Sequence, residues 1–341
     1  MTAAHIPAGI DADRLGRWIA DRFGVTEVQY RALSVGRSNL TFQLLVDGEP
    51  CWVLRRPPLG HKGGSAHNVM REGRIMHALG PTDVPTVNVL DLVDDPEVLE
   101  VPFVFMDYCA GHSLNEPADL ERIPREDRHA AGLRMMDVLA RIHKVDIDEV
   151  GLGDLRRPGT LTERQLRRWL GQFNEMTTRE IPEIQRVHDM LVEQAPPEAV
   201  TGLVHGDYKP NNLIWSDAGE IRAVVDWELS LTGEVEADLG YVMAMLNSKE
   251  TLRSAWVPQV SDGFPTREEM IAHYESIAGF QAHNVAYFEA FALWKFACIR
   301  EGVYTRLLRG QMGDLDVDVE GAGRGVDTLA QEAEAILLAN R

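Results

Sequence analysis

The chain of 341 residues has the composition of an ordinary globular protein, with 45% hydrophobic and 26% charged residues. Its formal net charge of -19 argues against nucleic acid and against an anionic membrane surface as partners, because both attract an excess of lysine and arginine. A chain of this length usually outgrows a single hydrophobic core, so we expect two lobes.

The three cysteines, Cys51, Cys109 and Cys298, are widely spaced and odd in number. This pattern argues against a disulfide framework and against a CxxC metal site, and it predicts buried thiols in a reducing compartment. The first nine residues lack the basic and then apolar pattern of a signal peptide. No apolar run approaches the roughly 20 residues that span a bilayer. We therefore expect a cytoplasmic protein with no membrane partner.

The first third of the chain predicts a β-rich unit. Apolar residues at helical spacing predict a helix over residues 10–23, with Asp11 or Asp13 as its N-cap. The sequence Asp47-Gly48 predicts a hairpin turn between two strands. Strands are predicted over residues 28–33, 40–46, 51–55, 87–92 and 103–106, with a further helix over residues 66–79.

The larger remaining part of the chain predicts helices. These are expected over residues 128–143, 161–194, 274–308 and 326–338, the last one after an acidic, Gly-rich tail. His143 ends the first of them without a neighbouring motif, so we interpret it as a packed histidine. Trp169 belongs to an aromatic series at helical spacing, which is more typical of a core than of a pocket.

Residues 203–226 carry the strongest functional signal. Two short apolar runs, 213–215 and 221–225, flank the turn-forming sequence Ser216-Asp217-Ala218-Gly219 and predict a β-hairpin. Asp226 follows the second strand, and the loop before the hairpin carries His205, Asp207, Lys209 and Asn212. Two carboxylates and a carboxamide at one end of a small ribbon suit magnesium, a hard cation that takes oxygen ligands and keeps substrate phosphates among them.

This spacing resembles the catalytic segment of the kinase-like phosphotransferases. Protein kinases have His-Arg-Asp, four residues and then Asn, with a metal-binding Asp beyond the next hairpin. Here His205-Gly206-Asp207 precedes Asn212 by the same interval, and Gly in place of Arg is typical of aminoglycoside phosphotransferases, choline kinases and homoserine kinases. The resemblance implies that Asp207 accepts the proton of an acceptor hydroxyl and that Lys209 reaches the transferring phosphate. It also implies that Asn212 and Asp226 hold Mg2+ against the phosphates of ATP.

The same resemblance implies an α+β, bilobal protein-kinase-like fold with a small β-rich N-terminal lobe and a larger helical C-terminal lobe. We place the nucleotide-binding lobe at residues 1–106, the catalytic and substrate-binding lobe at 107–341, and the hinge at about 106–111. The resemblance assigns nucleotide binding to Gly36, Ser38, Asn39, Arg55, Glu72, Met106, Asp107 and Tyr108. It assigns structural support of the catalytic loop to His205 and Asp238.

Arg55 is a departure from the pattern of the family, which places a lysine at the end of this strand. Arginine keeps the positive charge and binds phosphate in a bidentate way. Glu72, in the following helix, is its natural partner by the same resemblance. The neighbouring Arg56 leaves open which of the two arginines contacts the phosphates, and a surface arginine beside Pro57 is the simpler alternative.

Two runs, Val53-Leu54-Arg55-Arg56-Pro57-Pro58 and Asp226-Trp227-Glu228-Leu229-Ser230, resemble most the phosphotransferase-like domains fused to, or encoded with, acyl-CoA dehydrogenases. The first functional hypothesis is a kinase of small-molecule hydroxyls, with an aminoglycoside, a hydroxyacyl-CoA or another metabolite as acceptor. A protein kinase is the second, and the short segment between Asp226 and Asp238 argues against it. A nucleotide-binding pseudokinase scaffold is the third, and the retained acidic residues argue against it. The acceptor, the choice of ATP or GTP and the oligomeric state stay open.

Overall fold

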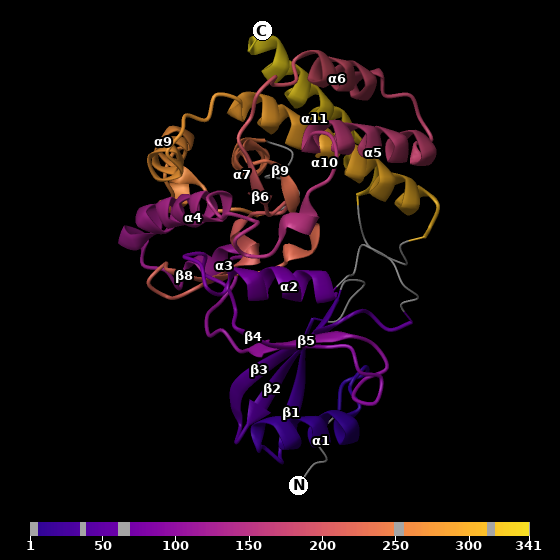
Figure 1. Cartoon of the computed structure of the whole chain (residues 1–341). Helices are drawn as coiled ribbons and strands as arrows, with labels where there is room; N and C mark the ends of the chain where they lie inside the picture. The colour runs from indigo at the N-terminus through magenta and orange to yellow at the C-terminus, as the bar shows by residue number, and fades with distance from the viewer. Residues whose placement is uncertain (1–5, 35–38, 61–68, 249–255, 312–317, 341) are drawn as a thin grey trace. The chain divides into compact units, whose positions relative to one another are not determined.

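The computed structural model describes residues 6–34, 39–60, 69–248, 256–311 and 318–340. It divides the chain into two compact units (Figure 1). Unit 1 comprises Met1–Gly111 and Arg222–Leu229, and unit 2 comprises His112–Ile221 and Ser230–Arg341. Unit 1 is rich in strands and unit 2 is mostly helical. The α+β fold class predicted from the sequence is therefore confirmed.

Unit 1 is built on a five-stranded antiparallel sheet in the order β1-β2-β3-β5-β4. Its strands are β1 (Gln29–Ser34), β2 (Leu40–Val46), β3 (Glu49–Arg56), β4 (Val89–Val93) and β5 (Phe103–Asp107). Its helices are α1 (Ala12–Phe23) and α2 (Val69–Leu79). The hairpin turn between β2 and β3 has positive φ at both Asp47 and Gly48, +54° and +87°, as the Asp-Gly sequence predicts.

The two helices of unit 1 pack on opposite faces of the sheet. Leu15 and Ile19 of α1 join the buried cluster that holds Phe103 and Phe105 of β5. Val104 lies on the other face, because successive side chains of a strand alternate. There Gly73 of α2 comes so close that an added Cβ would lie 2.6 Å from Val104. This close approach holds α2 against the sheet and fixes the position of its neighbour Glu72.

Unit 2 is built around a hydrophobic core formed mostly by helices. Its helices are α3 (Pro117–Leu120), α4 (Arg128–His143), α5 (Leu161–Met176), α6 (Pro182–Glu193), α7 (Glu236–Asn247), α9 (Arg267–Ala278), α10 (Val285–Leu308) and α11 (Val319–Ala339). Two short strands, β6 (Thr201–Val204) and β9 (Leu231–Glu234), pair with each other. The predicted hairpin is present as β7 (Leu213–Trp215) and β8 (Ile221–Val224). The chain passes from unit 2 to unit 1 within β8.

Two predicted helices have different limits in the structure. The helical region expected over residues 274–308 is divided, because α9 ends at Ala278 and Gly279, with a φ of +83°, forms its left-handed C-cap. The last helix begins at Val319, seven residues before the predicted start. Asp318 caps it by accepting a hydrogen bond from the Gly321 N–H at 2.8 Å, which offsets the low helix propensity of the Gly-rich sequence.

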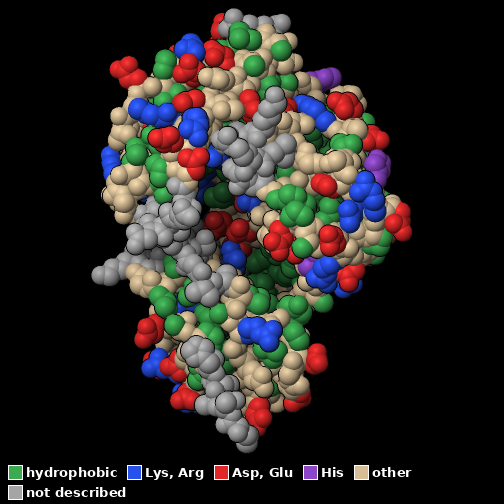
Figure 2. Space-filling model, turned by 180° about the vertical axis from the view of Figure 1, so that it is seen from behind, with side chains coloured by type: hydrophobic (Ala, Val, Ile, Leu, Met, Phe, Trp, Pro, Cys, Tyr) green, Lys and Arg blue, Asp and Glu red, His purple; other side chains and the backbone are tan. Residues whose placement is uncertain are grey.

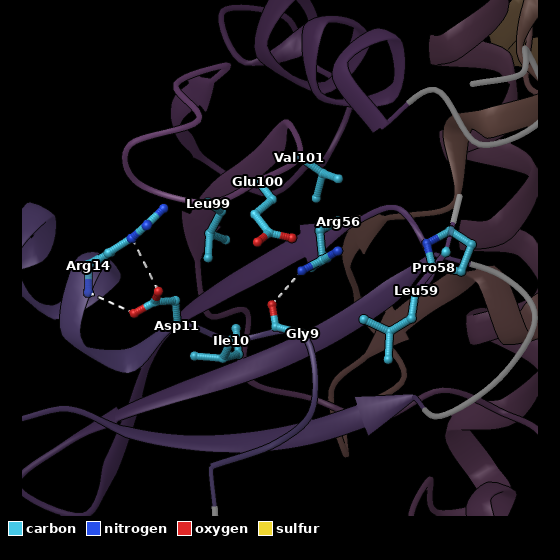
Figure 3. A pocket seen from close by; sticks show the side chains of 11 residues that line it. Gly9, Ile10, Asp11, Arg14, Arg56, Pro58, Leu59, Leu99, Glu100 and Val101 are labelled. Atoms are coloured by element: carbon cyan, nitrogen blue, oxygen red, sulfur yellow. Dashed lines mark hydrogen bonds and ion pairs between the residues drawn. The ribbon is translucent and has the colours of Figure 1, made fainter. Parts of the chain in front are cut away.

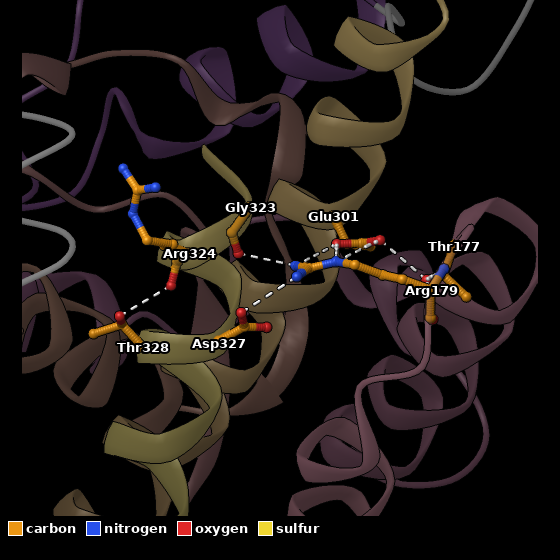
Figure 4. A network of polar contacts seen from close by, with 7 residues as sticks. All are labelled: Thr177, Arg179, Glu301, Gly323, Arg324, Asp327 and Thr328. Carbon is orange, nitrogen blue, oxygen red and sulfur yellow. Dashed lines mark hydrogen bonds and ion pairs between the residues drawn. The ribbon is translucent and has the colours of Figure 1, made fainter. Parts of the chain in front are cut away.

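An ion cluster ties three segments of unit 2 together (Figure 4). Arg179, in the link between α5 and α6, donates to the carboxylate of Glu301 on α10 at 3.0 Å and to Asp327 on α11 at 3.2 Å. Thr177 also donates to Glu301, at 3.0 Å, and Arg179 donates to the Gly323 carbonyl at 2.9 Å. The buried Glu301 carboxylate is thus surrounded by donors, as a buried charge requires.

The surface mixes charges of both signs. On the face in Figure 2, acidic and basic side chains alternate over each unit, with no large basic area among the described atoms. Within the described ranges, no helix combines the length and the apolar character needed to cross a membrane.

Candidate active site

Asp207, in the loop between β6 and β7 of unit 2, is held by both of its carboxylate oxygens. The Tyr241 hydroxyl donates to Oδ1. Oδ2 accepts from the Asn212 side chain at 2.8 Å and lies 2.9 Å from the Lys209 ammonium. The Asp207 side chain is still 17% exposed. Its carboxylate is therefore fixed in orientation while solvent, or a substrate, can reach it.

Asp238, at the start of α7, holds the backbone of this loop. Its carboxylate accepts hydrogen bonds from the N–H groups of His205 at 2.6 Å and Gly206 at 2.8 Å. Gly206 has a φ of +84°, a left-handed conformation that favours glycine, which accounts for Gly in place of Arg. Burial tends to raise the pKa of Asp238, but the hydrogen bonds and the neighbouring His143 and His205 bring the pKa below its ordinary value.

His143 is part of this support rather than a reacting group. Its Nδ1 lies 2.7 Å from the Tyr274 hydroxyl, and its Nε2 lies 3.4 Å from Asp238. The ring is buried. These contacts agree with the packed histidine expected from the sequence.

Tyr241 is a site residue that the sequence interpretation missed. It lies three residues after Asp238 on α7, so both side chains point to the same side of the helix. Burial and the adjacent Asp207 raise the pKa of Tyr241 well above its ordinary value. The phenol therefore stays protonated and acts as a donor to Asp207. The spacing from Asp238 was the signal that would have revealed it.

Unit 1 contains a second group of charged residues, centred on Arg55. The guanidinium Nε lies 2.8 Å from Glu72 Oε2, and Nη2 lies 2.8 Å from Asp226 Oδ1. The expected pair between Arg55 and Glu72 is therefore present, and Asp226 joins it from a position 171 residues away along the chain. Asp226 has a φ of +68°, a strained conformation for a non-glycine residue and one that recurs at functional sites.

The Arg55 cluster carries more negative than positive charge. Burial raises the pKa of Glu72 to about 7; Arg55 opposes this rise, while the charges of Asp226 and Glu228 add to it. The pKa of Arg55 also rises: burial tends to lower it, but attraction to Glu72 and Asp226 outweighs that effect. Burial is thus the main cause of the Glu72 shift, and the two neighbouring carboxylates cause the Arg55 shift. Such an excess of negative charge fits a bound divalent cation.

The donor atoms also fit magnesium, which is usually bound through one or two carboxylates together with phosphates and waters. Asp226 offers a carboxylate. Asn212 donates through Nδ2 to Asp207, which leaves the amide oxygen for a metal. No cluster of three or more His, Cys, Asp or Glu side chains arranged for a metal occurs among the described residues.

Arg56 faces a different part of unit 1 from Arg55. Figure 3 shows it directed at the Gly9 carbonyl, in a cavity of about 510 Å³ that Glu100 and Leu59 also line. Its Nε donates to the Pro57 carbonyl at 3.2 Å. The sequence left open which of the two arginines contacts the phosphates, and Arg55 is the one that lies in the cluster with Glu72 and Asp226.

Some backbone N–H groups of the predicted hinge donate hydrogen bonds within unit 1. The Asp107 N–H donates to the Asn88 carbonyl at 2.9 Å, and the Tyr108 N–H donates to the Cys51 carbonyl at 2.9 Å. Met106 lies within β5, paired with Val53. An adenine contact at Asp107 or Tyr108 would therefore use carbonyl oxygens. Asn39, one of the residues predicted to bind the nucleotide, is buried just before β2, whereas Gly36 and Ser38 lie outside the described residues.

A sequence profile of the phosphotransferase enzyme family matches residues 29–280. The matched range contains Arg55, the catalytic loop, Asp226 and Asp238. The chain belongs to this family.

The chain resembles known proteins over most of its length. It is 34% identical over 305 residues to the mouse protein named acyl-CoA dehydrogenase family member 10, covering 87% of this chain and 28% of the mouse protein. A crystal structure of a candidate aminoglycoside phosphotransferase from Ralstonia eutropha is 27% identical, with a TM-score of 0.81 over 96% of this chain and 98% of that one. The chain spans only 28–39% of the length of the curated relatives.

A more distant neighbour supports the fold alone. The ternary complex of an aminoglycoside phosphotransferase APH(4)-Ia variant with AMP-PNP and hygromycin B is 16% identical, with a TM-score of 0.59, and covers 96% of this chain and 98% of that one. The protein-kinase-like fold predicted for this chain is therefore confirmed.

Proposed function

We propose that this phosphotransferase moves the γ-phosphoryl group of ATP to a hydroxyl of a small molecule. The observation that carries the proposal is the Asp207 carboxylate, which Tyr241, Asn212 and Lys209 hold in one orientation while its side chain remains accessible. Phosphoryl transfer depends on positioning the reactants more than on covalent chemistry. A carboxylate held in one orientation can position the hydroxyl of an acceptor.

In the proposed mechanism Asp207 accepts the proton of the acceptor hydroxyl as the hydroxyl oxygen attacks the γ-phosphorus. The bond between the γ-phosphorus and the β–γ bridging oxygen breaks, and ADP leaves. Lys209, 2.9 Å from Asp207, binds the phosphoryl group as negative charge is redistributed over its oxygens. Arg55 binds the nucleotide phosphates, and Glu72 orients Arg55 through Nε. Asn212 and Asp226 are the proposed ligands of Mg2+, which when bound neutralises charge on the phosphates. Gly36, Ser38, Asn39 and the carbonyl groups of residues 106–108 are the remaining proposed nucleotide contacts.

The relatives support the same class of reaction. The APH(4)-Ia complex holds an ATP analogue and a small hydroxylated molecule in a protein of this fold. We infer the corresponding arrangement of donor and acceptor for this chain.

A hydroxyacyl-CoA is the second, more specific candidate acceptor. The observation that favours it is the name of the relatives, which are acyl-CoA dehydrogenase family members; the matched part makes up 28% and 37% of the length of two of them. A kinase and a dehydrogenase in one protein would act on related substrates.

A radiolabel assay tests the proposal. The full chain is incubated with Mg2+, γ-³²P-labelled ATP and a panel of hydroxylated metabolites, hydroxyacyl-CoA thioesters and aminoglycosides. We expect label in one class of acceptor with the wild type and a loss of transfer on the order of 10³-fold with Asp207→Asn. ATP binding without transfer to any acceptor would favour a pseudokinase scaffold instead.

A further inference from the structure

The Lys295 ammonium lies among aromatic rings close to Asp207, and the mechanism above does not use it. Lys295 is on α10, and its Nζ is 6.0 Å from the centre of the Trp169 ring on α5 and 5.9 Å from that of Tyr241 on α7. The side chain is half-buried. Among the described residues, no carboxylate lies within ion-pair distance of this ammonium and none accepts a hydrogen bond from it.

The electrostatic surroundings make this arrangement costly without a ligand. Burial lowers the pKa of Lys295, Asp207 and Asp238 act in the opposite direction from a distance, and Arg168 and Lys209 lower the pKa further. Two aromatic faces compensate only part of the lost hydration of a cation. An ammonium that has lost part of its hydration is stabilised by an opposite charge, so the position is suited to an anionic group that arrives with a ligand.

The ligand that could bring this group is the acceptor. Tyr241 connects the two positions, since its hydroxyl donates to Asp207 while its ring faces the Lys295 ammonium. Lys295 therefore lies one side chain away from the proposed base. A small molecule with its hydroxyl at Asp207 could reach the ammonium with a second group.

A second cation adds to the positive charge on this side of Asp207. The Arg168 guanidinium lies 5.0 Å from the centre of the Trp169 ring. Because Arg168 and Lys295 flank the same indole, a polycationic acceptor would meet repulsion from both.

We propose that Lys295 determines the acceptor specificity of the enzyme by binding a carboxylate or phosphate group of the acceptor while Asp207 faces its hydroxyl. This inference rests on the proposed function and restricts the class of acceptor. The acceptor is an anionic hydroxy compound, and polycationic aminoglycosides are excluded.

Binding to defined probes tests the inference without requiring turnover. The full chain is mixed with 3-hydroxybutyrate, with glycerate and with glycerol 3-phosphate, each compared with its uncharged counterpart (a methyl ester for each acid, glycerol for the phosphate). Saturation-transfer NMR should show the anionic member binding about tenfold more tightly or better. Comparing carboxylates with the phosphate identifies which anion the site takes.

Three variants assign any preference to Lys295. Lys295→Met keeps most of the side-chain volume and should abolish the preference for anions. Lys295→Arg keeps the positive charge and should retain much of that preference. Lys144→Met, which removes an exposed lysine on the C-cap of α4, should leave the preference unchanged. Equal binding of charged and uncharged probes by the wild type, or an undiminished preference in Lys295→Met, overturns the inference.

Transfer assays with the same probes separate this inference from the proposed function. If the anions bind through Lys295 but no probe or metabolite accepts phosphate from ATP, the proposed function fails while the anion site stands. If aminoglycosides accept phosphate as efficiently as hydroxy acids, the proposed function stands and the role of Lys295 is wrong.

Discussion

Two arginines of this protein each join a buried glutamate to a partly exposed aspartate, one in each unit. In unit 1, Arg55 joins Glu72, whose side chain is 2% exposed, to Asp226, which is 32% exposed. In unit 2, Arg179 joins Glu301, at 0%, to Asp327, at 41%. From their residues and exposure alone the two clusters would be judged alike.

They differ in how well the carboxylates are satisfied. Glu301 accepts hydrogen bonds from both Arg179 and Thr177, whereas Glu72 accepts from Arg55 and is repelled by Asp226 and Glu228. Asp226 also has a left-handed backbone, and neither Arg179, Glu301 nor Asp327 does. An ion cluster that its own chain completes stabilises the fold, whereas one left with excess charge and a strained backbone is prepared for a ligand.

Replacing Asp226 or Asp327 by asparagine, one at a time, should give the largest difference in transfer rate between the two clusters. Asp226→Asn should reduce Mg2+-dependent phosphoryl transfer on the order of 10³-fold, because it removes a carboxylate proposed to hold the metal. Asparagine also tolerates the left-handed conformation, so the backbone should remain unchanged. Asp327→Asn should leave transfer within about twofold, as expected for a side chain away from the reacting groups. Steady-state rates of the two variants measure this, and equal losses would contradict the comparison.

For stability, the unit 2 cluster should matter and the transfer rate should not change. Arg179→Ala should lower the free energy of unfolding by about 3 kcal/mol, because it leaves the buried Glu301 carboxylate without its main partner. The transfer rate of the protein that remains folded should not change. Urea unfolding, combined with rates measured well below the transition, tests both statements. A large loss of rate in the folded variant would mean that the unit 2 cluster is not purely structural.

Glu72 should give the unit 1 cluster a distinctive dependence on pH. A carboxyl with a pKa of about 7 in the folded chain, against 4.5 ordinarily, stabilises the fold fully below pH 4.5. This contribution is lost as the pH rises through 7. The loss should amount to roughly 2 to 3 kcal/mol between pH 5 and pH 8 without nucleotide.

Glu72→Gln is the control for this dependence, since an amide does not titrate. Urea unfolding at intervals between pH 5 and pH 8 should show a smaller decline for the variant than for the wild type. Identical pH profiles would show that Glu72 does not titrate in this range.

Arg55→Lys should have the smallest effect. Lysine keeps the charge but cannot bind Glu72 and Asp226 with one planar fork, so we expect about a tenfold loss in kcat/KM for ATP, equivalent to about 1.4 kcal/mol. Arg56→Lys is the matched control and should have little effect, because Arg56 faces Gly9. A similar loss in both variants would remove the distinction between these arginines.

Local patterns allowed much of the fold and part of the site to be predicted. The helix of residues 128–143 and the Asp-Gly hairpin follow from periodicity and turn chemistry, and both are present. The pair of Arg55 with Glu72 was accessible because both residues belong to one recognisable segment of the family. By contrast, the sequence did not reveal the break within the helical region predicted over residues 274–308, where the left-handed cap at Gly279 interrupts an otherwise continuous helical pattern.

The rest of the site depends on contacts distant in sequence. Asp226 reaches Arg55 across 171 residues, and no local pattern predicts which carboxylate shares a guanidinium. The surroundings of Lys295 are made by residues from α5, α7 and α10. Trp169 was interpreted as a core residue because helical spacing alone does not show which aromatic ring faces a cation.

The central claim is that this protein binds ATP together with magnesium as the phosphoryl donor, and the melting temperature of the full chain with and without millimolar Mg2+ and ATP tests that claim most directly. A nucleotide at 100 times its dissociation constant should add about 2.7 kcal/mol to the free energy of unfolding. We expect a clear rise in the melting temperature that requires both Mg2+ and ATP and is diminished in Asp226→Asn. A melting temperature that Mg2+ and ATP leave unchanged in the wild type would contradict the account.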